Sequence, residues 1–205
     1  MTTSSSSQQG ASALKQALRK QTLSRRDALG EAERIEMSLL AADRGIAAPC
    51  FDSDEFLPGT IIAGFHPIRS EIDPRPLMAA LAARGARLCL PVVLDKTTIE
   101  FRELVRGAPL VDCGFGTVGP DESAERLNPT LLLMPLSVFD NHGGRIGYGA
   151  GHYDRAIARL IDKGIDPVLI GMGFSAQHTD RVPVEPHDQP LHGMITEFGF
   201  EPARP

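Results

Sequence analysis

The 205-residue chain has few cysteines, no long apolar run and no excess of positive charge. Its three cysteines, Cys50, Cys89 and Cys113, form no C-x-x-C pair, so neither a disulfide framework nor a zinc site is predicted. No apolar segment approaches the length of a bilayer-spanning helix. The first ten residues are polar and lack the apolar stretch of a secretory signal. We therefore expect a cytoplasmic protein with no membrane partner.

The net charge of −5 argues against a nucleic-acid partner, because such proteins need many basic contacts to phosphate. Any anion must then be bound by a local basic cluster. Apolar residues make up 42% of the chain and charged residues 23%, which is ordinary for a globular protein. We expect a monomer with a disordered polar tail over residues 1–11 and a single domain over residues 12–205.

Helical and extended patterns alternate along the chain, which predicts a single α/β domain. We expect three layers, α/β/α, around a largely parallel central sheet. The region 105–128 is rich in glycine, proline and acidic residues and is expected to be mostly loop. After a basic N-terminal helix, helices are predicted at 31–44, 76–84 and 152–163, and strands at 60–65, 86–93, 98–104, 130–136, 167–172 and 194–198.

The segment 143–155, GGRIGYGAGHYDR, contains five glycines and lies between a predicted strand and a predicted helix. Such a loop can bring backbone N–H groups close to phosphate, with Arg145, Tyr148, Tyr153 and Asp154 around it. A helix N-terminus directed at an anion fits the same order of elements. It is neither a G-x-x-x-x-G-K-[ST] P-loop nor a G-x-G-x-x-G motif. The alternative is a glycine-rich turn without a ligand.

A basic cluster near the N-terminus supplies a second possible contact to phosphate. Lys15 and Arg19 are four residues apart, so they project from one face of a helix, and Lys20, Arg25 and Arg26 follow. The alternative is a solvated basic face. The phosphate interpretation depends on a second phosphate-binding element beside this helix.

Two acidic segments complete the candidate site. Glu71, in the segment 65–73, could accept hydrogen bonds from the N–H groups of a heterocycle, although a polar loop is the alternative. The segment 183–197 contains Glu185, His187, Asp188 and His192, but its prolines prevent the helical spacing of a zinc site. A contact from Asp188 to Mg²⁺ held by phosphates is the better hypothesis, with solvated acids as the alternative.

Four stretches taken together, KQALR, SEID, LLLMPLSVFDNHGGRIGYGAGHYDR and PVEPHDQPLHGMITE, resemble the 5-formyltetrahydrofolate cyclo-ligase family. The resemblance runs in the same order from Lys15 to Glu197. It implies ATP- and Mg²⁺-dependent conversion of 5-formyltetrahydrofolate into 5,10-methenyltetrahydrofolate, with release of ADP and phosphate. It also implies a phosphorylated formyl (imidate) intermediate.

The resemblance implies a role for each matching residue. Arg145 and Tyr153 would be catalytic, and Asp154 and Asp188 would contact Mg²⁺. Folate would be bound by His66, Glu71 and the loop residues 148–152. ATP would be bound by Lys15, Arg19, Arg145, Ile146, Gly147, Tyr148, Gly149, Ala150, Gly151, His152 and Tyr153.

The chain departs from the family pattern at two positions, since relatives usually read GYGGGYYDR or GYGKGYYDR. Ala150 adds only a methyl group, which is tolerated unless the residue needs a positive φ. His152 replaces an aromatic ring expected on the folate side. Two alternatives to the cyclo-ligase remain: a folate- or nucleotide-binding protein without activity, and an ATP-dependent enzyme with another substrate.

Overall fold

The computed structural model describes residues 3–52, 56–114, 116–185 and 188–204, with side chains from Gly10 onwards. The α-helices of the described residues are α1 (Thr3–Asp27), α2 (Glu31–Gly45), α3 (Arg75–Ala83) and α4 (His152–Asp162). Two short 3-10 helices are η1 (Pro49–Phe51) and η2 (Ser175–Gln177). The strands are β1 (Ile61–Ala63), β2 (Arg87–Val93), β3 (Ile99–Glu103), β4 (Leu110–Asp112), β5 (Val118–Pro120), β6 (Arg126–Leu127), β7 (Leu131–Pro135), β8 (Val138–Phe139), β9 (Arg145–Ile146), β10 (Val168–Met172), β11 (Gly193–Thr196) and β12 (Gly199–Pro202).

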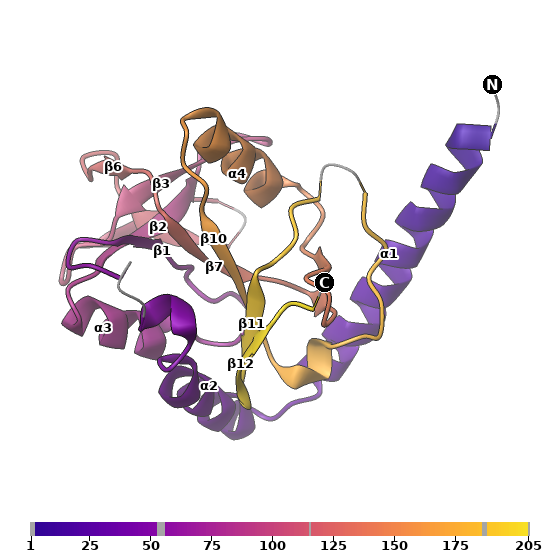
Figure 1. Ribbon diagram of the computed structural model, residues 1–205, viewed down its shortest axis with the longest axis horizontal. Helices are drawn as coiled ribbons and strands as arrows, with labels where there is room; N and C mark the ends of the chain where they lie inside the picture. Colours follow the sequence, from indigo (N-terminus) through magenta and orange to yellow (C-terminus); the bar gives the residue numbers. More distant parts are fainter. Residues whose placement is uncertain (1–2, 53–55, 115, 186–187, 205) are drawn as a thin grey trace.

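An eight-stranded sheet forms the centre of the molecule, in the order β12-β11-β10-β7-β1-β2-β3-β6 (Figure 1). Its five middle strands, from β11 to β2, run parallel to one another. The strands at both edges pair antiparallel. The prediction of a largely parallel sheet is confirmed.

Alternate side chains of β7 enter two separate apolar cores, because successive residues of a strand point to opposite faces. Leu131 and Leu133 pack with residues of α2 and α3. Leu132 and Met134 pack with Ile157 and other residues of α4 on the other face. A strand buried on both faces reads as a continuous apolar run, which is why TLLLMPL predicted it.

Helices α2 and α3 cover one face of the sheet and α4 covers the other, which confirms the three-layer α/β/α architecture (Figure 1). The predicted helices and long strands are present with ends shifted by up to two residues. Short strands were missed: β4, β5 and β6 lie within the expected loop 105–128, and β8, β9 and β12 were not predicted. Segments of two to four residues carry too little periodicity to be recognised.

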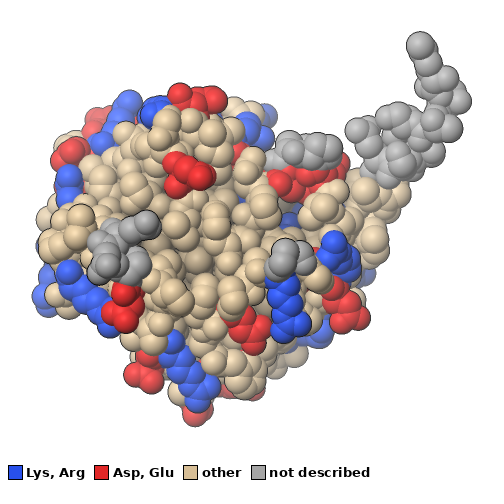
Figure 2. All heavy atoms as spheres, viewed as in Figure 1, with Lys and Arg blue, Asp and Glu red and all other residues tan. Residues whose placement is uncertain are grey.

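No helix of the described residues is long and apolar enough to cross a membrane. Helix α1 projects from the body of the molecule (Figure 1). It already begins at Thr3, whereas we expected a disordered tail up to residue 11. Its C-terminal half packs on the body near η2 and β8. On the visible face, acidic and basic side chains are intermixed (Figure 2).

The order of strands places a topological switch point between β1 and β7. From β1 the chain continues through α3 to β2 on one side, whereas from β7 it continues through α4 to β10 on the other. Ligands of open parallel sheets bind at such a switch point, beyond the carboxyl ends of the strands. The segment containing Glu71 follows β1, and the glycine-rich loop follows β7, so the fold brings both to this switch point.

Candidate active site

The glycine-rich loop, residues 147–151, connects β9 to the N-terminus of α4. Strand β9 pairs with β8 as a short hairpin directly after β7. Gly149 and Gly151 have φ values of +101° and +64°, which side chains rarely adopt, and Gly151 is the residue before the first turn of α4. The first N–H groups of a helix have no partner within it, so this turn can donate to an anion.

Asp140 fixes the entrance to this loop and was not predicted. Its side chain is buried, with Oδ1 accepting hydrogen bonds from the backbone N–H groups of His142 and Gly144, both at 2.8 Å. Its Oδ2 accepts from the N–H of Val182, also at 2.8 Å. A buried carboxylate with three backbone donors is a strong structural anchor. The signal in the sequence was the Asp-Asn-His-Gly turn, which we did not interpret.

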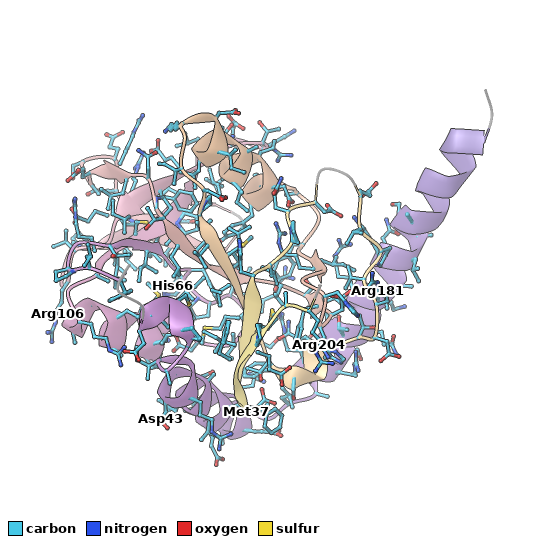
Figure 3. The ribbon with its side chains drawn as sticks, in the orientation of Figure 1. Met37, Asp43, His66, Arg106, Arg181 and Arg204 are labelled. Atoms are coloured by element: carbon cyan, nitrogen blue, oxygen red, sulfur yellow. The ribbon has the colours of Figure 1, made fainter. Side chains whose placement is uncertain are left out.

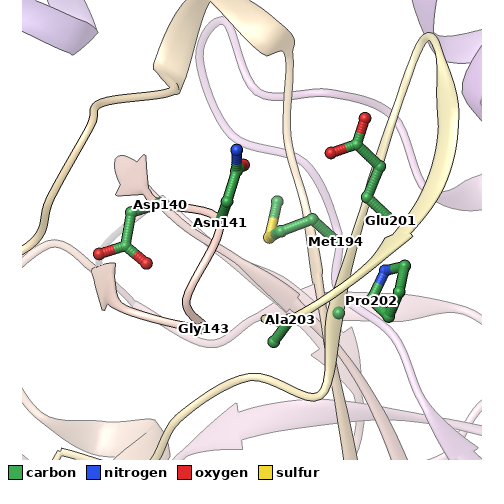
Figure 4. A pocket seen from close by; sticks show the side chains of 8 residues that line it. Asp140, Asn141, Gly143, Met194, Glu201, Pro202 and Ala203 are labelled. Carbon is green, nitrogen blue, oxygen red and sulfur yellow. The ribbon is translucent and has the colours of Figure 1, made fainter. Parts of the chain in front are cut away.

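A small hollow lies beside this anchor, between the turn at 140–143 and the strands β11 and β12 (Figure 4). None of the predicted site residues lines it. The C-terminal segment closes against the same turn, with the N–H of Arg204 donating to the carbonyl of Asn141. We assign no ligand to this hollow.

Carboxylates already pair with two of the predicted phosphate-binding cations. Arg145 donates from Nη2 to Oδ1 of Asp154 at 2.6 Å. Lys15 donates from Nζ to Glu185 and to Asp188, both at 2.7 Å. We call these five residues the ion-pair cluster: Lys15, Arg145, Asp154, Glu185 and Asp188. Burial acts to lower the pKa of Lys15, but the two carboxylates outweigh it and raise the pKa overall.

Helix α1 contacts the glycine-rich loop directly through Arg19, whose Nε donates to the carbonyl of Gly147 at 2.8 Å. Burial lowers the pKa of the Arg19 guanidinium. Lys15, Arg19 and Arg26 lie on one face of α1, at spacings of four and seven residues, which is close to whole helical turns. The basic helix and the glycine-rich loop, the two elements expected to contact phosphate, therefore lie side by side.

The predicted Mg²⁺ ligands lie on neighbouring segments. The backbone N–H of Gln189, next to Asp188, donates to Oδ1 of Asp154 at 3.5 Å. No three potential ligands of the described residues form a metal-binding group. His187 lies outside the described residues, and His192 accepts from the backbone N–H of Leu169 through Nδ1.

A second group, which we call the tyrosine cluster, consists of Arg26, Glu71 and Tyr148. Arg26 is 1% exposed and donates from Nη2 to the hydroxyl of Tyr148 at 3.1 Å. That hydroxyl in turn interacts with the Glu71 carboxylate, which also accepts from the backbone N–H of Ile68 at 2.8 Å. The cluster joins α1, the segment after β1 and the glycine-rich loop.

Burial raises the pKa of Glu71, while the N–H of Ile68, the Tyr148 hydroxyl, Arg26 and Arg69 act in the opposite direction. The net effect is a raised pKa, so desolvation of the charged form is the larger influence. The Glu71 carboxylate is buried and held in place by hydrogen-bond donors, so it can accept hydrogen bonds from a ligand with N–H groups.

Several buried polar atoms around the site have no hydrogen-bond partner among the described residues: Nη1 of Arg26, Oγ of Ser137, Nε of Arg145 and the hydroxyl of Tyr153. Burial raises the pKa of Tyr153 well above its ordinary range. Tyr153 therefore stays protonated and can donate. Unpaired buried donors are uncommon in folded proteins, and their concentration here is typical of a ligand site.

The remaining predicted residues, His66, Ala150 and His152, belong to neither the ion-pair cluster nor the tyrosine cluster. His66 (Figure 3) lies after β1 and interacts electrostatically with Asp73. His152 lies against the turn between β2 and β3, with Nε2 3.0 Å from the carbonyl oxygen of Lys96. Ala150 has no positive φ, so its methyl group causes no backbone strain.

The fold and the site define a doubly wound α/β protein with a glycine-rich loop that follows β7, beside the topological switch point of its sheet. The model of the 5-formyltetrahydrofolate cyclo-ligase family matches residues 11–197, and the chain belongs to this family. It is 29% identical over 178 residues to the 5-formyltetrahydrofolate cyclo-ligase of Escherichia coli K12, covering 84% of this chain and 94% of that protein. It is 23% identical to the mouse protein of the same name, over 89% of this chain and 93% of the relative.

Solved structures agree with this assignment. The NMR structure of Aquifex aeolicus 5,10-methenyltetrahydrofolate synthetase superimposes with a TM-score of 0.76 at 29% identity, covering 94% of each chain. The synthetase of Mycoplasma pneumoniae has the same fold, with a TM-score of 0.68 at 24% identity and coverage of 89% and 98%. The chain is thus a member of an enzyme family.

Proposed function

We propose that the protein converts 5-formyltetrahydrofolate and ATP into 5,10-methenyltetrahydrofolate, ADP and phosphate, with Mg²⁺ as cofactor. The observation that carries this proposal is the hydrogen bond from Arg19 to Gly147, which unites the basic helix with the glycine-rich loop. The basic residues alone could be a solvated face, and the loop alone could be a turn. Together they form a cationic cradle of the kind that a triphosphate needs.

The chemistry requires activation of the formyl oxygen, because water is a poor leaving group from a formamide carbon. In the proposed sequence the formyl oxygen attacks the γ-phosphorus and ADP leaves, giving a phosphorylated imidate. N10 then attacks the formyl carbon and loses its proton, and the carbon–oxygen bond breaks to release phosphate. Phosphoryl transfer depends on positioning and charge compensation rather than on covalent help from the protein.

The ion-pair cluster has the groups for charge compensation. Arg145 has an unpaired Nε in addition to its contact with Asp154, so it can hold the carboxylate and an oxygen of phosphate together. Lys15 can exchange its carboxylates for phosphate oxygens, because both ligands are anions. The N-terminus of α4 adds backbone donors.

Asp154 and Asp188 suit Mg²⁺, which in phosphate sites takes one or two protein carboxylates and completes its shell with phosphate oxygens and water. When bound, Mg²⁺ neutralises the charge that develops on the phosphates. The ion pairs of both aspartates with cations keep the carboxylates oriented before nucleotide binds. Folate is assigned to the switch point at Glu71, with its formyl group toward the glycine-rich loop.

A spectrophotometric assay tests the proposal. The protein is incubated with 5-formyltetrahydrofolate, ATP and Mg²⁺, and the absorbance of the methenyl product is followed together with ADP release. We expect product and ADP in equal amounts, no product when ATP is replaced by ADP, and neither product nor ADP when Mg²⁺ is chelated.

Other outcomes distinguish the alternatives. Binding of folate or ATP without product would identify a binding protein. ATP hydrolysis that responds to a different carboxamide or formyl compound, but not to 5-formyltetrahydrofolate, would identify another substrate. Either result would overturn the proposed reaction.

A further inference from the structure

Arg26 is the most deeply buried cation of the described chain, and its guanidinium is only partly satisfied. Its Nε donates to Oγ of Ser70 at 3.0 Å and lies 3.9 Å from Oδ1 of Asp27, and its Nη2 donates to the hydroxyl of Tyr148. Nη1 is buried and has no partner among the described residues. A charged donor left unpaired in the interior is destabilising, so a purely structural arginine would be expected to use it.

The hydroxyl of Tyr148 lies between Arg26 and Glu71 and interacts with both. It accepts a hydrogen bond from the guanidinium and, toward a charged carboxylate, acts as a donor. One group thus presents an acceptor to Arg26 and a donor to Glu71. The lactam edge of an oxo-pteridine ring has the same pattern, with a carbonyl oxygen next to a ring N–H.

Tyr148, whose hydroxyl contacts Arg26 and Glu71, has room to move away from them. Tyr148 is 39% exposed, and it lies between two glycines, of which Gly149 has a φ of +101°. The guanidinium of Arg69 is 6.0 Å from the centre of its ring. Arg69 itself has a φ of +55°, the only positive value of a non-glycine residue in the described part of the chain. Such strain persists where surrounding contacts impose it, and it is frequent at ligand sites.

We propose that Arg26 and Glu71 form a recognition pair for the lactam edge of the substrate ring, and that the Tyr148 hydroxyl occupies this pair until substrate binds. The inference rests on the proposed function, because it assumes a reduced folate as ligand. Arg26 donates to the ring carbonyl through Nη1 and Nη2, while Glu71 accepts from the adjacent N–H and the exocyclic amino group. Arg26 is then a specificity residue, although it takes no part in phosphoryl transfer.

Discrimination between two ring substituents follows from this arrangement. A ring that carries an amino group in place of the carbonyl presents a donor to the guanidinium, which can only donate. A site that hydrogen-bonds one substituent rejects the analogue that cannot complete the bond. The wild-type protein should therefore favour the oxo compound in a way that depends on Arg26.

The test compares dissociation constants of 5-formyltetrahydrofolate and its 4-amino-4-deoxy analogue, measured by calorimetry without ATP. The wild type is compared with Arg26→Gln, Arg26→Lys and the control Lys20→Gln, which changes an exposed cation of the same helix. We expect Arg26→Gln to reduce the preference for the oxo compound by about ten- to a hundredfold, the range for a hydrogen bond with a charged partner. Arg26→Lys, which keeps a charged donor, should restore part of the preference, and Lys20→Gln should leave it unchanged.

The readout is the ratio of the two dissociation constants in each variant relative to that ratio in the wild type. A difference in basicity between the two rings affects every variant equally and therefore cancels. A folded Arg26→Gln protein with the wild-type ratio overturns the inference, and if wild-type turnover is normal the proposed function stands. Absence of folate binding and turnover in the wild type overturns both.

A second variant covers the case in which Arg26→Gln does not fold. Tyr148→Phe removes the hydroxyl that competes with substrate, so we expect the dissociation constant of 5-formyltetrahydrofolate to fall severalfold. Weaker binding by this variant would contradict the role of the hydroxyl as an occupant. The wild-type thermal unfolding midpoint provides the reference for the folding of each variant.

Discussion

The ion-pair cluster and the tyrosine cluster flank the same loop but differ in how their polar groups are satisfied. In the first, each cation is paired with a carboxylate through a charged hydrogen bond, and Lys15 joins α1 to Glu185 and Asp188 at the other end of the chain. In the second, a buried guanidinium and a desolvated carboxylate are linked through a neutral hydroxyl. The first is suited to exchanging one anion for another, and the second to recognising a pattern of donors and acceptors.

This difference follows from the chemistry of the proposed ligands. A triphosphate with Mg²⁺ brings its own charge, so paired side chains can rearrange around it without leaving charges unpaired. A neutral heterocycle brings only directional hydrogen bonds, so its site must have its partners fixed in advance. Substitutions in the two clusters should consequently affect different kinetic constants.

The largest effect is expected from Arg145→Ala, which removes the cation that pairs with Asp154. We expect turnover to fall by at least about a thousandfold, the range for arginines that stabilise phosphoryl transfer. The methenyl absorbance assay measures it, and circular dichroism verifies the fold. Activity within tenfold of the wild type would show that Arg145 only orients Asp154.

Asp154→Asn should have the next largest effect. Asparagine keeps an oxygen that can accept from Arg145 but removes the charge, so we expect turnover to fall about a hundredfold and the Mg²⁺ concentration for half-maximal rate to rise. A Mg²⁺ titration of the rate measures both quantities. An unchanged Mg²⁺ dependence would assign Asp154 to positioning of Arg145.

Lys15→Ala tests the exchange of carboxylates for phosphate. We expect the KM for ATP to rise about tenfold or more, as for loss of a charge-assisted hydrogen bond, with a smaller change in the KM for folate. Glu185→Gln serves as the matched variant, since it weakens the ion pair without removing the cation. If it lowers the KM for ATP, the carboxylate competes with the nucleotide for Lys15.

Glu71→Gln should weaken binding of 5-formyltetrahydrofolate without lowering the free energy of unfolding at neutral pH. We expect the KM for 5-formyltetrahydrofolate to rise about tenfold with the KM for ATP nearly unchanged, because only a carboxylate accepts two N–H donors strongly. The raised pKa of Glu71 means that the folded state holds this proton more tightly than the unfolded state. The Glu71 contribution to stability is therefore lost as pH rises through the raised pKa.

The variant should accordingly be at least as stable as the wild type at neutral pH, and this advantage should disappear below the ordinary pKa range of glutamate. Urea unfolding across pH measures the difference. A variant that is less stable at neutral pH and equally stable in acid would contradict the assigned direction.

The smallest effect is expected from returning the loop to the common family pattern. Ala150→Gly and His152→Tyr should each change kcat and both KM values by less than about threefold. Neither side chain is assigned an interaction that forms only in the transition state. Ala150 has no positive φ, and His152 lies against the β2–β3 turn. A large change in the KM for folate in His152→Tyr would extend the folate site to this residue.

The sequence predicted the fold well where periodicity was long. The apolar run of β7 and the amphipathic pattern of α4 were each identified to within a residue or two. Strand β12 and the hairpin strands β8 and β9 were missed, because two to four residues show no distinct period and depend on a partner strand for their conformation.

The site residues named from the sequence stay predictions, and the structure shows which of them lie together. Residues with charge and a family pattern, such as Arg145 and Glu71, were identified from the sequence, and the structure brings Tyr148 between Arg26 and Glu71. Arg26 was named only as one of the basic residues near the N-terminus and Asp140 was not named, because burial gives them their importance and a sequence does not show burial. The roles of all these residues in catalysis stay predictions for the experiments above.

By itself, the sequence determined the order of helices and strands, the glycine-rich loop between β7 and α4, and the family to which the chain belongs. These are local or linear properties, set by backbone preference and side-chain periodicity. Only the tertiary structure decided which polar groups meet: Lys15 with Glu185 and Asp188, and Arg26 with the hydroxyl of Tyr148. Such contacts depend on the packing of α1 against segments more than a hundred residues away, and that packing also removes Arg26 from water.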